Sequence, residues 1–156
     1  MQVGNPAADP PLRPDGKLNV GAAVGKGVLA VVRSHPAQER PYSGMIPIYS
    51  GEVADDLARY LVDSEQTNSA LGLGVSINKD ASVRGAGGFL IQVLPFASEA
   101  TLSQLEANLA DLPAVTEMLD KGMTPGDITE RLLQGLGMAD GAFELTPKYV
   151  VCAKHV

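Results

Sequence analysis

Apolar residues recur along this chain with two different periods, and the two periods predict helices and strands. Over residues 53–62, Val53, Leu57 and Leu61 repeat at four-residue steps, which predicts a helix with one apolar face. The charged residues around them are expected on the solvated face: Glu52, Asp55, Asp56 and Arg59. Ser50 stands before the first turn and is the expected N-cap.

Four short apolar runs predict strands. They cover residues 28–33, 45–49, 71–78 and 89–94. Pro47 confines the second run to a sheet edge or a bulge, because proline cannot donate to a strand ladder. The turn-forming cluster at residues 78–80 joins the third run to the fourth. The glycines at 85–88 have no helix after them, so they predict a bulge or a close backbone approach rather than a nucleotide-binding fingerprint.

The second half of the chain predicts helices. Residues 101–104 have capping-box spacing, with Leu102, Leu105 and Leu109 following on one face. A short helix is expected between Pro113 and Gly122, and residues 124–127 form a strong start for another. A last strand is expected at residues 143–151. The order of the expected elements favours an α+β fold with mixed or antiparallel sheets packed with helices. That order is strands, a helix, strands, helices and a last strand.

Composition and charge exclude several classes. A chain of 156 residues is long enough for one domain with its own core. The net charge of −6 argues against a nucleic-acid backbone partner and against anionic membrane surfaces. The apolar runs are too short to span a bilayer, and the N-terminal stretch lacks the pattern of a signal peptide. A single cysteine makes no intramolecular disulfide.

The sequence contains no clear signal for a catalytic site or a cofactor site. Residues 21–27 lack the spacing and the hydroxyl residue of a phosphate-binding loop, so a glycine turn before a strand is the better interpretation. Asp55 and Asp56 are neighbours on a helix and do not face each other. The cluster at residues 65–67 is expected to close the helix and reverse the chain, with no local base to make it catalytic. We therefore predict neither catalytic nor cofactor-binding residues.

Cys152 and His155 have a C-x-x-H spacing that zinc accepts. Two ligands make only half of a structural zinc site. For this chain the preferred interpretation of Cys152 is a free thiol, and we expect no bound cofactor.

Several segments together resemble one family, heat shock protein 33, the redox-regulated 33-kDa chaperonin. The segments are VGNP from Val3, GKLNVGAAVGKGVLAVVR from Gly16, PYSGMIPIYSGEVADDLARYLVDSEQTNSALGLGV from Pro41, and GGFLIQVLP from Gly87. Their joint order is specific and covers most of residues 3–95, while the helical remainder is similar in pattern more than in identity.

The resemblance implies an ATP-independent holdase that binds unfolded clients under oxidative stress, and a homodimer. It also implies a zinc-binding redox switch in full-length members, whose first cysteine pair would begin at Cys152, although Lys154 stands where the second cysteine is expected. Residues 1–151 would be part of the chaperone core domain, and residues 152–156 would lead to the zinc module. The alternative is an interaction scaffold without chaperone activity. A cytoplasmic location is expected, with a plastid or other organelle open if a targeting segment precedes the sequence.

Overall fold

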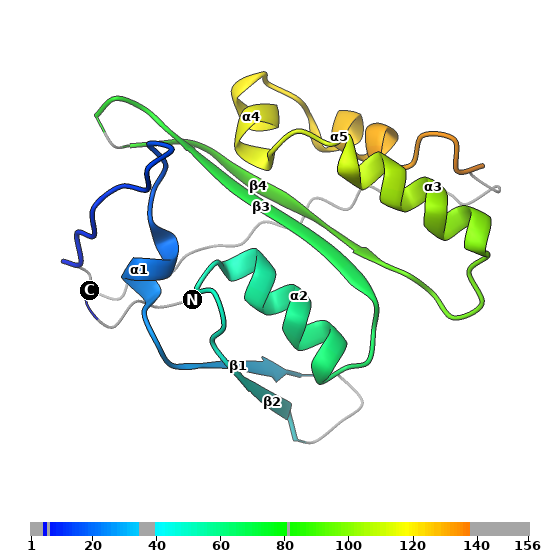
Figure 1. The fold of residues 1–156 in the computed structure, drawn as a ribbon, viewed down its shortest axis with the longest axis horizontal. Coiled ribbons are helices and arrows are strands. Elements are labelled where there is room, and N and C mark those ends of the chain that lie inside the picture. The colour runs from blue at the N-terminus through cyan, green and yellow to red at the C-terminus, as the bar shows by residue number, and fades with distance from the viewer. Residues whose placement is uncertain (1–4, 6, 35–39, 81, 138–156) are drawn as a thin grey trace.

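The structure, a computed structural model, describes residues 5, 7–34, 40–80 and 82–137. Helices and strands follow each other along the chain as shown in Figure 1. They are α1 (Val20–Val24), β1 (Val28–Arg33), β2 (Tyr42–Pro47), α2 (Val53–Asp63), β3 (Ser69–Ile77), β4 (Val83–Gln92), α3 (Glu99–Ala110), α4 (Val115–Asp120) and α5 (Pro125–Leu132). None of the helices in the described ranges has the length and apolar character needed to cross a bilayer.

The strands form two antiparallel two-stranded sheets, β1–β2 and β3–β4. The β1–β2 register runs from the pair Val28–Pro47 to the pair Arg33–Tyr42. The longer β3–β4 ribbon lies between two layers: α2 and the β1–β2 sheet on one side, and α3, α4 and α5 on the other (Figure 1). This arrangement confirms the expected α+β fold with antiparallel sheets.

The buried core lies between β4 and the helices α4 and α5. Its fully buried members are Val115, Met118, Ile128 and Leu132, and Phe89 and Ile91 of β4 pack against them. Glycines on β3 allow this approach. A side chain at Gly74 would place its Cβ 2.6 Å from the backbone nitrogen of Thr116, and one at Gly72 would strike the Phe89 ring at 2.4 Å. Among the glycines at 85–88, for which the sequence predicts a bulge or a close backbone approach, Gly88 shows such an approach.

The helix α2 packs between the two sheets, but with a different buried set from the one that its sequence predicts. Val53, Leu57 and Leu61 are half-buried, while Tyr60 is 1% exposed and Asp56 is 4% exposed. The expectation that Asp56 lies on a solvated face is wrong. The periodicity of apolar residues does not predict that Asp56 is buried. Its burial depends on hydrogen bonds to the backbone that precedes the helix.

Several boundaries differ from the sequence-based expectations. β2 begins at Tyr42 and ends at Pro47, and β4 begins at Val83, so the glycines at 85–88 lie inside a strand. The irregular register falls at Ser76 and Ile77, opposite the start of β4. Of these glycines, Gly88 lies against the paired strand of its own hairpin, with a Cβ there 2.3 Å from the Gly72 carbonyl oxygen, while Gly85 has no neighbour within 4 Å. Residues 143–151, the expected last strand, lie outside the described residues.

The helix starts show the same mixture of outcomes. The N-cap of α2 is Glu52 and not Ser50, and the N-cap of α3 is Ser98, which accepts from the Thr101 backbone, so α3 starts earlier than predicted. The strong helix start expected at residues 124–127 is confirmed, and it takes the form of a capping box in which Thr124 and Asp127 bond each other's backbone. Residues 20–24 form the one-turn helix α1, which the glycine pattern does not predict.

Truncating Met118 to alanine should destabilise the fold, since its side chain is 0% exposed in the core. We expect a loss of about 2–5 kcal/mol in the free energy of unfolding. Met45→Ala is the matched control, because the Met45 side chain is 69% exposed. Urea unfolding should show a lower midpoint for Met118→Ala with an unchanged slope. Equal midpoints for the two variants would contradict this core.

Candidate functional site

A pocket of about 350 Å³ opens where the two layers of strands meet α2. β1 contributes Val31 and Arg33, α2 and its end contribute Leu57, Tyr60, Leu61 and Glu65, and the long hairpin contributes Leu71, Leu90 and Gln92. The walls are thus mainly aliphatic, with polar groups confined to a few positions. Such a composition suits an apolar group held by a small number of hydrogen bonds.

The chain reversal after α2 places Glu65 at this pocket. The Gln66 and Thr67 amides donate to carbonyl oxygens of the last helical turn, Val62 at 3.1 Å and Leu61 at 3.0 Å. Gln66 has a φ of 52°, in the left-handed region. The Thr67 hydroxyl donates to the Glu65 carbonyl at 3.1 Å. These contacts confirm that residues 65–67 close the helix and turn the chain into β3.

Glu65 forms a charged pair with Arg33 across the pocket, between the end of α2 and the end of β1. The hydrogen bond from Arg33 to the carboxylate raises the pKa of the guanidinium. The other carboxylate oxygen, Oε1, is buried without a hydrogen-bond partner among the described residues, as is the Tyr60 hydroxyl. Burial raises the pKa of Tyr60, and the nearby Glu65 carboxylate raises it further. The phenol therefore stays protonated and available as a donor at neutral pH.

The Tyr60 ring lies directly beneath β2. A Cβ added at Gly44 would be 2.5 Å from the Tyr60 hydroxyl oxygen, so only glycine leaves room for the ring. This contact fixes the distance between the β1–β2 sheet and α2. It also explains why the tyrosine of this helix, rather than one of its leucines, is its most buried apolar side chain.

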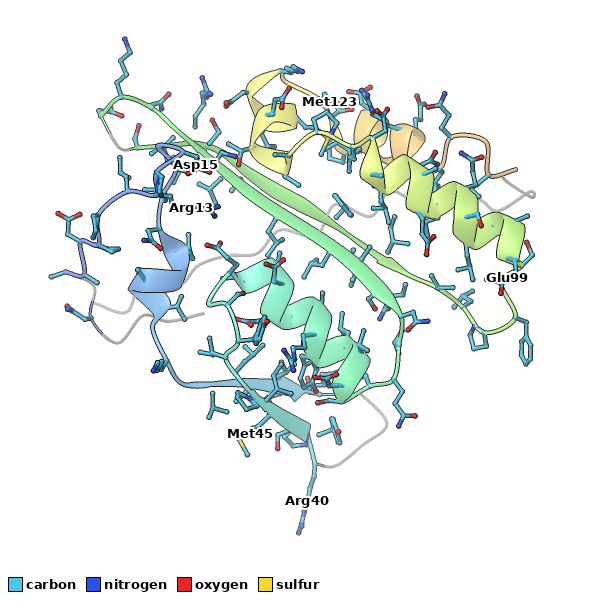
Figure 2. The ribbon with its side chains drawn as sticks, viewed as in Figure 1. Arg13, Asp15, Arg40, Met45, Glu99 and Met123 are labelled. Atoms are coloured by element: carbon cyan, nitrogen blue, oxygen red, sulfur yellow. The ribbon has the colours of Figure 1, made fainter. Side chains whose placement is uncertain are left out.

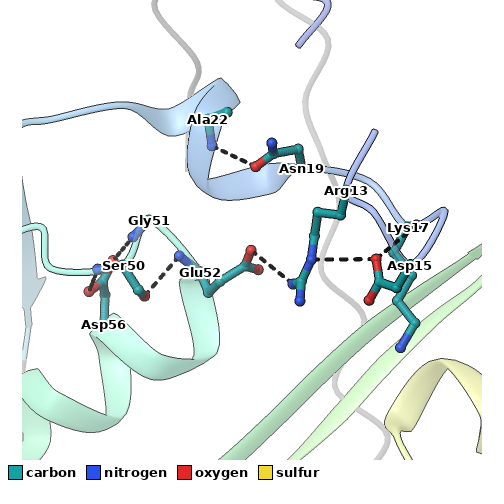
Figure 3. Close-up of polar contacts among 9 residues, drawn as sticks. All are labelled: Arg13, Asp15, Lys17, Asn19, Ala22, Ser50, Gly51, Glu52 and Asp56. Atoms are coloured by element: carbon teal, nitrogen blue, oxygen red, sulfur yellow. Dashed lines mark hydrogen bonds and ion pairs between the residues drawn. The ribbon is translucent and has the colours of Figure 1, made fainter. Parts of the chain in front are cut away.

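Asp56 anchors the other end of α2 to the preceding turn (Figure 3). Its Oδ1 accepts from the backbone amides of Tyr49 at 3.0 Å and Ser50 at 3.1 Å, and its Oδ2 accepts from that of Gly51 at 2.8 Å. Burial acts to raise the pKa of Asp56, but these three bonds outweigh it and the net shift is downward. The carboxylate thus holds the turn at residues 49–51 against the first turn of the helix, which has no side-chain N-cap bond of its own.

Contacts around this turn also fix the N-terminal segment. Arg13 lies 3.6 Å from both Asp15 and Glu52, linking the segment before α1 to the start of α2 (Figure 3). Gly21 lies against the turn so closely that a Cβ there would be 2.6 Å from the Ser50 carbonyl oxygen. Gly21 therefore packs against the backbone of this turn, whereas Gly25 has no neighbouring atom within 4 Å of an added Cβ.

Two strand faces expose apolar side chains. The outer face of β1–β2, opposite α2, consists of Val28, Ala30, Val32, Met45 and Pro47. Met45 points away from α2 on this face (Figure 2). The second is the hairpin stripe, defined as Leu73, Val75, Ile77, Val83 and Leu90, on the pocket side of β3–β4. Its members are between 41% and 63% exposed. Contiguous apolar exposure of this kind is typical of interaction surfaces.

A polar cluster ties the tip of the long hairpin to α4. Ser76, 3% exposed, donates to Asp120 and accepts from the guanidinium of Arg84 at 2.7 and 2.9 Å. Arg84 also pairs with Asp120 directly. The bond from Ser76, followed by that from Arg84, lowers the pKa of Asp120. The cluster holds the hairpin and α4 together on the face opposite the stripe.

The described residues contain no group of three or more metal-binding side chains. Cys152 and His155 lie outside the described residues. The sequence has one cysteine, whereas structural zinc takes four nitrogen or sulfur ligands. The residues of this chain therefore do not fit a complete structural zinc site.

Comparisons with known proteins identify the family. The family model described as Hsp33 protein matches residues 2–152. The 33 kDa chaperonin of Clostridium tetani is 44% identical over 137 residues, which cover 87% of this chain and 46% of that protein. The 33 kDa chaperonin of Clostridium acetobutylicum is 41% identical over 148 residues, covering 94% and 50%.

The fold comparison agrees. The crystal structure of the 33 kDa chaperonin, a heat shock protein 33 homologue, from Thermotoga maritima matches with a TM-score of 0.73 and 36% sequence identity. The match covers 82% of this chain and 43% of that one. The chain therefore belongs to the heat shock protein 33 family, and it spans about half the length of the curated relatives it matches.

Replacing Asp56 with asparagine should destabilise the protein, because the amide NH₂ would face a backbone donor that the carboxylate now accepts from. We expect a loss of about 1.5–3 kcal/mol at pH 7. The pKa of Asp56 is lowered in the folded state, so its contribution is complete above the unfolded value of about 3.9 and is lost as the pH falls through the folded pKa.

Urea unfolding from pH 7 down to pH 3 measures this difference. The gap between the native protein and Asp56→Asn should narrow at the acidic end. Asp55→Asn is the control, since Asp55 is the exposed neighbour in the same helical turn. A gap that is equally wide at all pH values would show that the charge of Asp56 is not what stabilises the turn.

Proposed function

We propose that this chain is part of the substrate-binding core of a holdase chaperone, which binds unfolded proteins without ATP under oxidative stress. The observation that carries the proposal is the amount of apolar surface exposed on its two sheets, in a chain of this family. Unfolding proteins expose apolar segments of many shapes, and an apolar surface binds them without stereospecific contacts. The relatives carry the name chaperonin, which is consistent with this activity.

The proposal describes binding and not catalysis. Residues 21–27 lack the spacing and the hydroxyl residue of a phosphate-binding loop, which supports a mechanism independent of nucleotide. The acidic net charge of −6 does not favour nucleic acid or an anionic membrane as the partner. We place the activity in the cytoplasm, since the relatives are bacterial and a chain with one cysteine requires no oxidising compartment.

Holdase activity should appear as suppression of client aggregation. The chain, added at near-stoichiometric ratio to thermally unfolding citrate synthase, should reduce light scattering without ATP, because it covers the exposed apolar segments of the client. Serum albumin at the same concentration is the control for crowding. Undiminished scattering would favour the alternative function, an interaction scaffold without chaperone activity.

The same assay tests redox control. One thiol forms a sulfenic acid or an intermolecular disulfide, but not the paired disulfides of the family's switch. Any holdase activity of this chain should therefore be unchanged by peroxide or by a zinc chelator, apart from slow dimerisation through Cys152. Cys152→Ser is the control variant. A large gain in activity with peroxide that Cys152→Ser abolishes would overturn this expectation.

We also propose that the chain self-associates as a homodimer. Each strand in the described sheets has one unpaired edge, because both sheets have only two strands. Unpaired edges recruit strands from other chains. Sedimentation velocity at tens of micromolar concentration should show a dimer, and a clean monomer under those conditions would contradict the proposal.

A further inference from the structure

We propose that the pocket beside α2 binds a free small molecule, a neutral alcohol or phenol with an apolar body, whose hydroxyl group bridges Tyr60 and Glu65. The holdase function proposed above concerns unfolded chains and does not require this site. The inference therefore adds a small-molecule ligand to the protein, and its test is independent of chaperone activity.

Two buried polar atoms at the pocket lack hydrogen-bond partners. Tyr60 is 1% exposed, and its hydroxyl group has no partner among the described residues. The Glu65 side chain is 12% exposed, and the same holds for its Oε1 atom. Both residues line the pocket. Buried polar groups are nearly always hydrogen-bonded, because burial without a partner forfeits the bonds that water makes in the unfolded chain. The geometry therefore favours an occupant that supplies both bonds.

Strand pairing brings the Tyr60 hydroxyl group to the pocket side of the β1–β2 sheet. That hydroxyl lies against Gly44, where an added Cβ would be 2.5 Å from its oxygen. Gly44 pairs directly with Val31, which belongs to the pocket wall. Directly paired residues of antiparallel strands share a face, so the hydroxyl meets the sheet on the pocket side. Arg33 lies two residues further along β1 on this face and pairs with Glu65.

The hydrogen-bonding pattern of these groups selects a hydroxyl group. Arg33 occupies the Oε2 atom of Glu65, so Oε1 remains as an acceptor that needs a donor. Burial and the nearby carboxylate raise the pKa of Tyr60, so the phenol keeps its proton and offers a donor that needs an acceptor. A ligand hydroxyl group accepts from Tyr60 and donates to Glu65, and no smaller organic group does both.

The charges at the pocket disfavour an ionised ligand. A carboxylate group has no proton for the Oε1 atom of Glu65 and would be repelled by it. An ammonium group has donors but no acceptor, so it would leave the Tyr60 proton unpaired, and it would also lie near the Arg33 cation. A neutral hydroxyl group avoids both penalties.

The other walls of the pocket favour an organic molecule over water. They consist of aliphatic side chains, namely Val31, Leu57, Leu61, Leu71 and Leu90. A water molecule would satisfy the two polar atoms but would leave these side chains hydrated, whereas an apolar body removes their surface from water. The volume of about 350 Å³ is at the lower end of the range for ligand pockets. We therefore expect a monocyclic molecule with one hydroxyl group.

Four probes that share one ring test which polar group the pocket selects. They are para-fluorobenzyl alcohol, para-fluorotoluene, para-fluorobenzylamine and para-fluorobenzoate, titrated into the native chain at neutral pH and followed by fluorine NMR. The alcohol should bind about tenfold more tightly than the toluene, because a site built to hydrogen-bond a hydroxyl group rejects the analogue that lacks it. It should also bind more tightly than either ion. Equal affinities for the alcohol and the toluene, tighter binding of an ion, or no saturable binding of the alcohol would each overturn the proposal.

Tyr60→Phe tests the hydrogen bond from the protein. It removes the donor and keeps the ring, so the alcohol should bind about tenfold more weakly while the affinity for the toluene stays the same. Thermal unfolding should show no loss of stability, because the hydroxyl group that is removed has no partner among the described residues. Tyr49→Phe is the matched control, since Tyr49 is 77% exposed and lies outside the pocket, and it should change neither affinity. An unchanged affinity of Tyr60→Phe for the alcohol, or an equal loss for both probes, would contradict the bridging role of Tyr60.

Val31→Phe tests where the ligand lies. The added ring would fill the pocket from its β1 wall, so neither the alcohol nor the toluene should bind. Val32→Phe is the control, because Val32 is the next residue on the opposite face of β1 and is 66% exposed. Circular dichroism checks that both variants fold, and alcohol binding that persists in folded Val31→Phe would rule out this pocket. If Val31→Phe does not fold, nuclear Overhauser contacts in the native chain decide. The ring protons of the alcohol should contact the methyl groups of Leu57 and Leu90, and the absence of those contacts would refute the site.

Discussion

The structure depends on how closely α4 can approach the β3–β4 hairpin. This approach is possible because Gly74 carries no side chain, so the backbone of α4 at Thr116 meets the strand directly, while Gly72 leaves room for the Phe89 ring. Met118 and Val115 are then buried against Phe89 and Ile91, and most of the core forms on this one face. With the core gathered there, the large side chains of the other face are left for α2, the pocket and the solvent.

This unequal use of the two faces links packing to function. An apolar strand face left partly open costs stability, because burying each large side chain would contribute about 1.5–3 kcal/mol. The core therefore relies on a few very well buried residues and on polar anchors such as Asp56 and Ser76. Those anchors are local and directional, so they hold the hairpins in place without covering the apolar surface. The holdase function proposed above would use this combination of an ordered scaffold and an uncovered surface.

The sequence predicted the larger features of the fold because they follow from periodicity and from turn and cap residues. The β1 strand, the position of α2 and the Thr124 capping box all have strong local signals. The burial of Asp56 and Tyr60 had none, since it depends on the Tyr49–Gly51 turn and on the missing side chain of Gly44. The sequence did not predict the one-turn helix α1, because glycine-rich segments rarely favour a helix.

The candidate site was only partly predictable for the same reason. The sequence singled out residues 65–67 and assigned them a structural role, which the hydrogen bonds confirm. It did not indicate that Glu65 pairs with Arg33, because the two residues are far apart in sequence and the pair exists only once β1 and α2 are packed. The sequence identifies most residues of the hairpin stripe as apolar strand residues. It does not indicate which of them remain exposed, because that depends on where α2 ends.

The contact between Gly44 and Tyr60 has a consequence for how this sequence can change over time. A methyl group at position 44 would occupy the space of the phenol oxygen, so that substitution is tolerated only after Tyr60 has become smaller. The two sites are therefore coupled, and their effects on stability will not add. Exchange of tyrosine for phenylalanine at position 60 removes the oxygen but keeps Cε2, which would lie 2.8 Å from the added Cβ, so the ring itself has to be replaced or moved. Substitutions at positions 44 and 60 should accordingly occur together among members of the family.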